Sequence, residues 1–232
     1  MEAGPPPLEP AAWRELLGQH QLAYLGMIFV DNAQQFAAEL KKIAAYEPVM
    51  VCVHALRDRT PFADGCAFLA EALKIEADIG IPVAHETHRG RMLCNPWVTA
   101  AYAEKFGDLK FCADFSHFVN VCESLLANMD DLLAPVIAKS IQIHARVGWE
   151  QGPQVPDPRA PEWAEHVAAH EGGWDRIHAA RRAAGAEMLA VDPEFGGVPY
   201  LPLLPYTRQP MVDLWEVRKW MMERLRARWA DR

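Results

Sequence analysis

The sequence has no surplus of basic residues. It contains 23 lysines and arginines against 31 aspartates and glutamates, so its formal net charge is −8. A protein that grips phosphate backbones normally presents a basic surface, which releases counterions on binding. Nucleic acid is therefore not expected as a partner.

Long apolar runs and paired cysteines are also lacking. No run of about 18 apolar residues occurs, and the first ten residues, MEAGPPPLEP, show no basic segment followed by an apolar one. The five cysteines are an odd number without a CxxC spacing. Buried free thiols in a reducing compartment explain them best. We therefore expect a protein of the cytoplasm that neither spans a membrane nor is secreted.

Several common catalytic motifs are missing as well. The chain has no GxSxG, no phosphate-binding P-loop or GxGxxG, and no HExxH. The enzyme classes that depend on those motifs are not indicated.

What the chain does have is enough apolar side chain for a sizeable core. Of its 232 residues, 51% are hydrophobic and 23% are charged. A chain of roughly 200 to 250 residues can still form one barrel or large sheet. We expect one domain covering residues 1–232.

Short β-rich runs alternate with amphipathic stretches along the chain. Candidate strands span residues 22–30, 49–56, 81–88, 109–117, 137–147 and 186–194. Helical spacing relates Phe36, Leu40 and Ile43 in one of the stretches between them, and a last helix is expected to begin near Pro210. Repeated strand and helix predict an α/β fold with a parallel sheet.

Four candidate strands end in residues that can bind a metal. The runs are VAHETHRG, FCADFSH, IQIHARVG and VDPEFGG, which supply Glu86, Asp114, His144 and Glu194. The ends of parallel strands meet at one edge or mouth. Three carboxylates and one imidazole suit a single divalent ion, with Mn²⁺, Mg²⁺ or Co²⁺ favoured and Zn²⁺ possible.

These segments resemble a known family. HETHRGR, ADFSH with its DxxH spacing, HARVG followed by EQGPQVPDPRAPE, and PEFG followed by PYLPLLPYTRQP are similar to xylose isomerase-like TIM barrels, a group of sugar phosphate isomerases and epimerases. The resemblance covers residues 22–220. It implies a TIM-type (β/α) barrel and a metal held by Glu86, Asp114, His144 and Glu194. It also implies that His117 faces the substrate or a second metal.

Other polar residues near these strand ends have two interpretations each. His54, His88, His117 and Arg146 are candidate substrate-binding residues. Alternatively, His54 is a satisfied core histidine, His88 orients a neighbouring carboxylate and His117 caps a helix. The guanidinium of Arg146 suits carboxylate, phosphate or sugar oxygens, or it forms an ion pair with Asp192 or Glu194.

The resemblance implies a metal-dependent isomerase or epimerase that acts on a small sugar or related polyhydroxy carbonyl compound through an enediolate. Glu86 and Glu194 are then the expected proton-transferring residues. A dehydratase or an endonuclease-like hydrolase on the same scaffold remains an alternative. A non-catalytic sugar- or metal-binding protein is an alternative from another class.

The strand count is lower than a closed barrel requires. Six clear βα units are visible, whereas a TIM barrel has eight, so we expect a barrel that is incomplete at its N-terminus. Unpaired strand edges favour pairing, which predicts a homodimer, a covering C-terminal segment, or a start upstream of Met1. The proline-rich stretches 151–161 and 193–210 predict functional loops over the mouth, with rigid surface spacers as the alternative.

Overall fold

The computed structural model describes residues 1–230. Strands and helices alternate along most of the chain, and a 3₁₀ turn, η1, precedes the longest helix. In chain order the elements are β1 (Glu2–Ala3), α1 (Pro10–His20), β2 (Leu25–Val30), α2 (Ala33–Ala44), β3 (Met50–Ala55), α3 (Phe62–Ile79), β4 (Val83–Glu86), α4 (Pro96–Lys105), β5 (Phe111–Ala113), α5 (Phe115–Cys122), α6 (Asp130–Lys139), β6 (Ser140–His144), η1 (Pro161–Trp163), α7 (Ala164–Ala183), β7 (Ala190–Asp192) and α8 (Leu214–Trp229).

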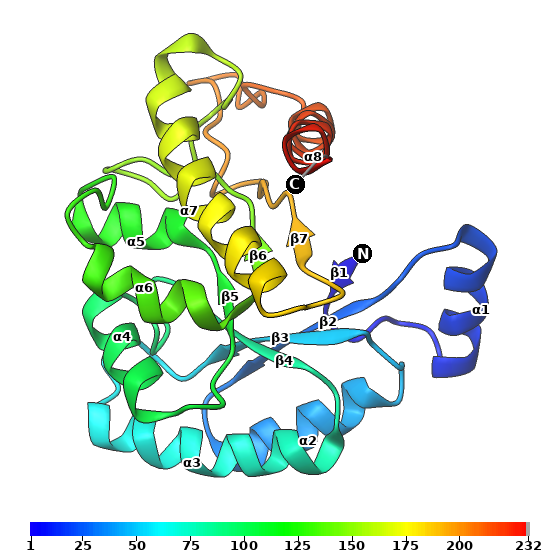
Figure 1. Ribbon diagram of the computed structural model, residues 1–232. Helices are drawn as coiled ribbons and strands as arrows, with labels where there is room; N and C mark the ends of the chain where they lie inside the picture. Colours follow the sequence, from blue (N-terminus) through cyan, green and yellow to red (C-terminus); the bar gives the residue numbers. More distant parts are fainter. Residues whose placement is uncertain (231–232) are drawn as a thin grey trace.

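The seven strands form one parallel sheet in the order β1 to β7. The sheet curves into a nearly closed barrel, with most helices on its outside (Figure 1). This confirms the prediction of a TIM-type α/β barrel. Within residues 1–230 no ladder joins β7 to β1, so a seam remains between the first and the last strand.

All six predicted strands are present, but each is shorter than its apolar run. At residues 109–117, for example, β5 ends at Ala113 and α5 begins at Phe115. Asp114 is the N-cap of that helix, and its carboxylate accepts a hydrogen bond from the backbone N–H of Ser116. The expected strand over residues 109–117 is therefore wrong in its second half, because Asp114 and Ser116 lie at the start of a helix.

The sequence analysis missed β1 and α1. A strand of two residues carries no readable period, although Glu2 pairs with Leu25 in the sheet. Helix α1 begins at Pro10 and buries only Trp13 and Leu17, so its apolar face is too narrow to give a clear pattern. The N-terminal segment, for which the sequence analysis predicted no strand, therefore contributes one strand to the barrel.

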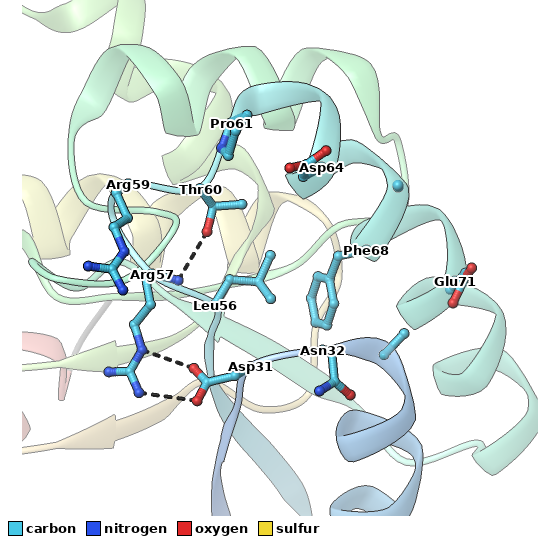
Figure 2. A pocket seen from close by; sticks show the side chains of 12 residues that line it. Asp31, Asn32, Leu56, Arg57, Arg59, Thr60, Pro61, Asp64, Phe68 and Glu71 are labelled. Atoms are coloured by element: carbon cyan, nitrogen blue, oxygen red, sulfur yellow. Dashed lines mark hydrogen bonds and ion pairs between the residues drawn. The ribbon is translucent and has the colours of Figure 1, made fainter.

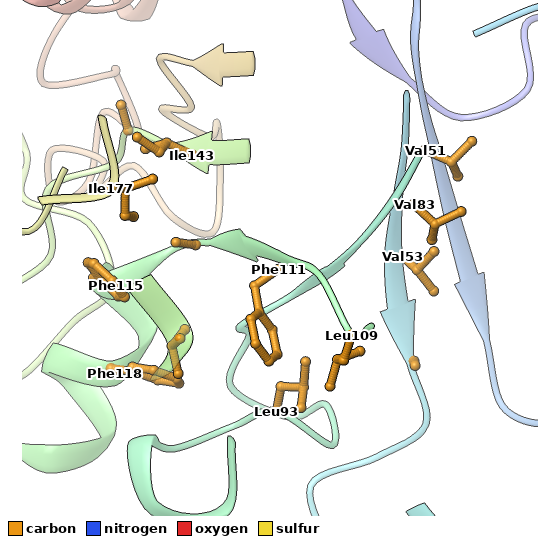
Figure 3. Packing of buried hydrophobic residues seen from close by; sticks show 14 of the residues in the cluster. Val51, Val53, Val83, Leu93, Leu109, Phe111, Phe115, Phe118, Ile143 and Ile177 are labelled. Carbon is orange, nitrogen blue, oxygen red and sulfur yellow. The ribbon is translucent and has the colours of Figure 1, made fainter. Parts of the chain in front are cut away.

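Alternate residues of each strand face either the helices or the barrel interior. Val51, Val53 and Val83 belong to the outer layer, in the same cluster of buried apolar residues as Phe111 and Ile143 (Figure 3). The interior holds a smaller apolar cluster, whose buried members are Met50, Cys52, Ala84, Cys112 and Ile141. Polar residues lie above this cluster, toward the strand ends.

The final helix starts four residues after the expected position. Asp213 is its N-cap, and the Asp213 carboxylate accepts a hydrogen bond from the backbone N–H of Trp215. The helix buries Val217, Met221 and Leu225, as their spacing predicted. No helix among residues 1–230 is long and apolar enough to cross a membrane.

Candidate metal centre

The four predicted metal ligands come together at the carboxyl ends of the strands. One ligand atom from each of Glu86, Asp114, His144 and Glu194 lies within 4.8 Å of the others. Glu86 and His144 end β4 and β6, Asp114 caps α5, and Glu194 follows β7 by two residues. The first three are almost fully buried, whereas the Glu194 side chain is 27% exposed. Glu194 is therefore the ligand that solvent can reach.

His144 has a carboxylate near each ring nitrogen. Its Nδ1 lies 2.9 Å from Glu194 Oε2 and 3.5 Å from Glu86 Oε1, while its Nε2 lies 3.1 Å from both oxygens of Glu2. Burial lowers the pKa of His144, but the three carboxylates outweigh this and raise it well above its ordinary value. The surroundings of this ring thus favour positive charge.

Glu2 is a site residue that the sequence analysis did not find. Its side chain is 2% exposed, and besides His144 it accepts a hydrogen bond of 2.7 Å from Gln142 Nε2. A carboxylate on the outer nitrogen of a ligating histidine fixes the tautomer and makes the other nitrogen a better ligand. No sequence motif marks Glu2, because only the pairing of β1 with β2 brings it into the barrel.

Arg146 is buried against the same carboxylates. Its guanidinium donates to Asp114, where Nε lies 3.1 Å from Oδ2 and Nη2 is closer, and Nη2 lies 3.2 Å from Glu194 Oε2. Of the two ion pairs the sequence left open, the one with Glu194 is present. The Arg146 Nη2 also lies 3.0 Å from His117 Nε2. Its Nη1 is buried without a hydrogen-bond partner among the described residues.

Glu86 is held at the inner wall of the site. His54 Nε2 lies 2.5 Å from Glu86 Oε2, and the Cys52 thiol donates to the same oxygen over 3.7 Å. Burial would raise the pKa of Glu86, but His54 and His144 hold it well below its ordinary value. His54 thus contacts a carboxylate within the core, as expected of a core histidine.

A group of rings forms the outer wall. His88 and His117 lie 3.9 Å apart between ring centroids, and Tyr200 lies over the Arg146 guanidinium at 4.6 Å. His88 Nε2 and Tyr200 Oη are 3.3 Å apart. Burial lowers the pKa of both histidines, most strongly for His117, so neutral imidazoles face this side. His117 lies inside α5 and does not cap a helix.

The residues present fit a divalent metal. His144 Nδ1 and Glu194 Oε2 face each other at 2.9 Å, yet in the described part of the chain neither atom makes a hydrogen bond. Three carboxylates, from Glu2, Glu86 and Glu194, lie within 3.5 Å of one imidazole. Together with Asp114 they carry four negative charges, against two positive charges on the His144 imidazolium and the Arg146 guanidinium, and buried charges need compensation. A dication held by oxygens of Glu86, Asp114 and Glu194 and by a nitrogen of His144 would supply the missing positive charge.

The proline-rich loop after β6 packs against the segment that carries Glu194. Gln154 is 3% exposed and exchanges two hydrogen bonds with the backbone of Gly196, of 3.0 and 2.7 Å. Val155 is fully buried, and its N–H donates to Val147. The loop is therefore a packed support beside the site and not a free lid.

A pocket of about 570 Å³ lies at the carboxyl ends of β2 and β3, and none of the four candidate metal ligands lines it (Figure 2). Arg57 and Arg59 line it, but Arg57 is paired with Asp31, and Asp64 and Glu71 also line the wall. Because the charges are mixed, this pocket does not by itself indicate an anionic ligand.

Comparison with known proteins supports the architecture. No protein-family model and no curated protein matches the chain. Among solved structures the chain is similar to the crystal structure of the probable 3-DHS dehydratase AsbF, involved in petrobactin synthesis, from Bacillus anthracis. The TM-score is 0.57 at 13% sequence identity, over 93% of this chain and 81% of that chain. The likeness establishes the fold. At this identity it does not transfer an activity.

Proposed function

We propose that this protein is a divalent-metal-dependent isomerase or epimerase of a small sugar or related polyhydroxy carbonyl compound, located in the cytoplasm. The observation that carries the proposal is the convergence of Glu86, Asp114, His144 and Glu194 from four separate strand ends. Three carboxylates and one imidazole suit Mn²⁺, Mg²⁺ or Co²⁺ as ligands. When bound, the metal would supply electrostatic stabilisation for an oxyanion that develops on the substrate.

Glu194 is the residue best placed to move a proton. Burial would raise the pKa of Glu194, but His144 and Arg146 keep it below its ordinary value, so the carboxylate is ionised at neutral pH. Its partial exposure lets a substrate reach it. The Glu86 side chain is only 1% exposed, and its carboxylate forms an ion pair with His54. Glu86 therefore holds the metal. In an isomerisation Glu194 alone would remove the proton from one carbon and return it to the next, whereas an epimerisation needs a second acid on the opposite face of the enediolate, for which Glu86 is the candidate.

The outer wall provides groups that hold substrate oxygens. Arg146 offers its unpartnered Nη1 as a donor, and a guanidinium fixes two neighbouring oxygens better than a point charge does. Neutral His88 and His117 both donate and accept hydrogen bonds, which suits hydroxyl groups. The Tyr200 ring covers Arg146 and helps to exclude water.

A second candidate function is that of a dehydratase. The similarity to a probable 3-DHS dehydratase favours it, and elimination of a hydroxyl also begins with removal of a proton beside a carbonyl. The two functions differ in the second proton transfer. An isomerase or epimerase returns the proton to carbon, whereas a dehydratase donates one to the leaving hydroxyl.

The decisive experiment combines metal analysis with a substrate panel. Metal-depleted protein is reloaded separately with Mn²⁺, Mg²⁺, Co²⁺ and Zn²⁺ and incubated in D₂O with ketoses, inososes, hydroxypyruvate and 3-DHS. Proton NMR then follows exchange of the carbon-bound hydrogen and product formation. Isomerisation with deuterium incorporation supports the main proposal, and loss of water from the substrate supports the second. Protein that takes up no metal on soaking would refute both.

A further inference from the structure

A second cluster of metal-ligating side chains lies inside the barrel, beneath the candidate metal centre. The thiols of Cys52 and Cys112 and one ring nitrogen of His144 lie within 4.8 Å of one another. All three residues are at most 1% exposed. Neither thiol is needed for the proposed reaction.

The strand order explains why the two thiols meet. Cys52 lies on β3 and Cys112 on β5, with β4 between them. The inward residue of β4 at this level is Ala84, which pairs with Cys52 and has too small a side chain to keep the thiols apart. The barrel therefore has sulfur on two sides of a small interior space.

His144 and Glu2 border the same space. His144 Nε2 lies 3.1 Å from Gln142 Nε2, and Gln142 pairs with Cys112 in the sheet. Glu2 places its oxygens 3.1 Å from His144 Nε2. The Gln142 Oε1 is buried and has no hydrogen-bond partner among the residues described. A polar atom left unsatisfied in this place points to a missing ligand.

We propose that Cys52, Cys112 and His144 form a second cation site that takes a soft, thiophilic divalent ion such as Zn²⁺ or Cd²⁺. Two sulfurs and one imidazole nitrogen supply three of the four ligands that zinc takes, with Zn–S bonds of about 2.3 Å and Zn–N bonds of about 2.0 to 2.1 Å, and water can supply the fourth. Thiolates select soft ions against Mg²⁺ and Mn²⁺. The two sites thus differ in the class of metal they accept.

Binding requires that both thiols release their protons to solvent. The cation replaces these two protons, together with any proton on the His144 nitrogen that ligates it, because a metal ligand must be deprotonated.

The test is a Cd²⁺ titration of the reduced, metal-depleted full-length protein, followed by the thiolate-to-cadmium absorption band in the ultraviolet. We expect the band to saturate at one Cd²⁺ per chain and to disappear in Cys112→Ala. The control is the triple variant Cys66→Ala, Cys94→Ala, Cys122→Ala, which keeps both interior thiols and should keep the band.

Three results would overturn the proposal. The wild-type protein could show no band, or the triple variant could lose it, which would place the cadmium elsewhere. The band could also persist in Cys112→Ala, which would assign it to Cys52, His54 and Glu86, a neighbouring set with the same spacing. If Cys112→Ala does not fold, Cys112→Ser, which nearly preserves the volume, gives the same comparison. Because no activity is measured, the result is independent of the proposed function.

Discussion

At the scale of single residues, His144 determines what the site can do. Both ring nitrogens face carboxylates, Glu194 on one side and Glu2 on the other. A neutral imidazole has one lone pair and one N–H, so a carboxylate that accepts from Nε2 turns the Nδ1 lone pair toward Glu86 and Glu194. Of the three glutamates next to His144, Glu86 and Glu194 are therefore candidate ligands of the metal, whereas Glu2 orients the ring.

Glu194→Gln should remove metal affinity and activity together while the protein remains folded. The amide keeps the shape but loses the charge, and we expect Mn²⁺ binding to weaken roughly 100-fold, equivalent to about 2.7 kcal/mol. Stability should change by about 1 kcal/mol or less, because the side chain is partly exposed. Isothermal titration and urea unfolding measure the two quantities, with the exposed Glu187→Gln as control. Unfolding of Glu194→Gln with normal metal content would show that Glu194 has a structural role.

Glu2→Gln should weaken metal binding without removing a ligand. The amide cannot replace the anion that accepts from His144 Nε2, and loss of such an outer partner costs roughly 10- to 100-fold in metal affinity. Equilibrium dialysis with Mn²⁺ measures this, and Glu9→Gln, an exposed change in the same segment, is the matched control. Equal affinity in the Glu2 variant would mean that the contact serves packing alone.

At the scale of elements, the site is built from strand ends that are held by their neighbours. Asp114 is placed by the start of α5, where Ser116 donates to it through both its backbone N–H and its hydroxyl. The segment after β7 is fixed by Gln154 of the preceding loop. Helix α7 in turn holds that loop, because His170 accepts from the Gly148 N–H.

Gln154→Ala should loosen the segment that carries Glu194. Two hydrogen bonds to the Gly196 backbone are lost, each worth about 0.5 to 1.5 kcal/mol, and the metal affinity should fall along with stability. Gln151→Ala removes the same side chain from an exposed position of the same loop and should have little effect on either. Thermal unfolding with and without Mn²⁺ compares the two variants. If both lose the same stability, the Gly196 contacts contribute nothing.

His170 should make stability depend on pH. Burial lowers the pKa of His170 in the folded protein below the unfolded value of about 6.5, so the unfolded chain binds the proton more readily. This contribution is present above about pH 6.5 and is lost as the pH falls.

His170→Leu should therefore be less stable at pH 7.5, by about 1 to 3 kcal/mol, since the Gly148 N–H loses its acceptor. Its stability should also fall less than that of the wild type between pH 7.5 and pH 5.5, as measured by urea unfolding. His20→Gln, at an exposed histidine, is the control. A wild-type slope in His170→Leu would show that other groups cause the pH dependence.

At the scale of the whole molecule, the barrel has a seam and an apolar C-terminal segment. Glu2 contacts His144 and Gln142 across the interior, so a carboxylate links the first strand to the sixth although β1 and β7 do not pair. Several large apolar side chains between residues 198 and 215 are exposed, among them Trp215 at 66% and Tyr206, which is fully exposed. Exposed apolar groups gathered in one segment favour association.

We therefore expect a homodimer in which a second copy covers residues 198–215. Light scattering after gel filtration should give about twice the mass of 26.0 kDa. The double variant Tyr206→Ser, Trp215→Ser should be monomeric, whereas Trp97→Ser, which removes another exposed tryptophan, should not. A monomeric wild-type protein at micromolar concentration would exclude this assembly.

The amino-acid sequence by itself determined the fold class and the candidate metal ligands. Strand and helix periods are local, so the alternation from residue 22 onward predicts a parallel α/β sheet, and the resemblance to xylose isomerase-like proteins added its closure into a barrel. Parallel strands bring their carboxyl ends together, so Glu86, Asp114, His144 and Glu194 could be expected at one mouth from their positions alone. The helix that starts at Phe115 was missed because the apolar run continues through it.

Only the tertiary structure decided which distant residues complete the site. Glu2 meets His144 over 142 positions of the chain, and Cys52 meets Cys112 because the intervening strand carries Ala84. Arg146 meets Asp114 because the two residues follow the ends of the paired strands β6 and β5. These contacts depend on strand order, barrel curvature and side-chain size together. Local patterns encode none of these, because each joins elements that neighbour one another only after the barrel has formed.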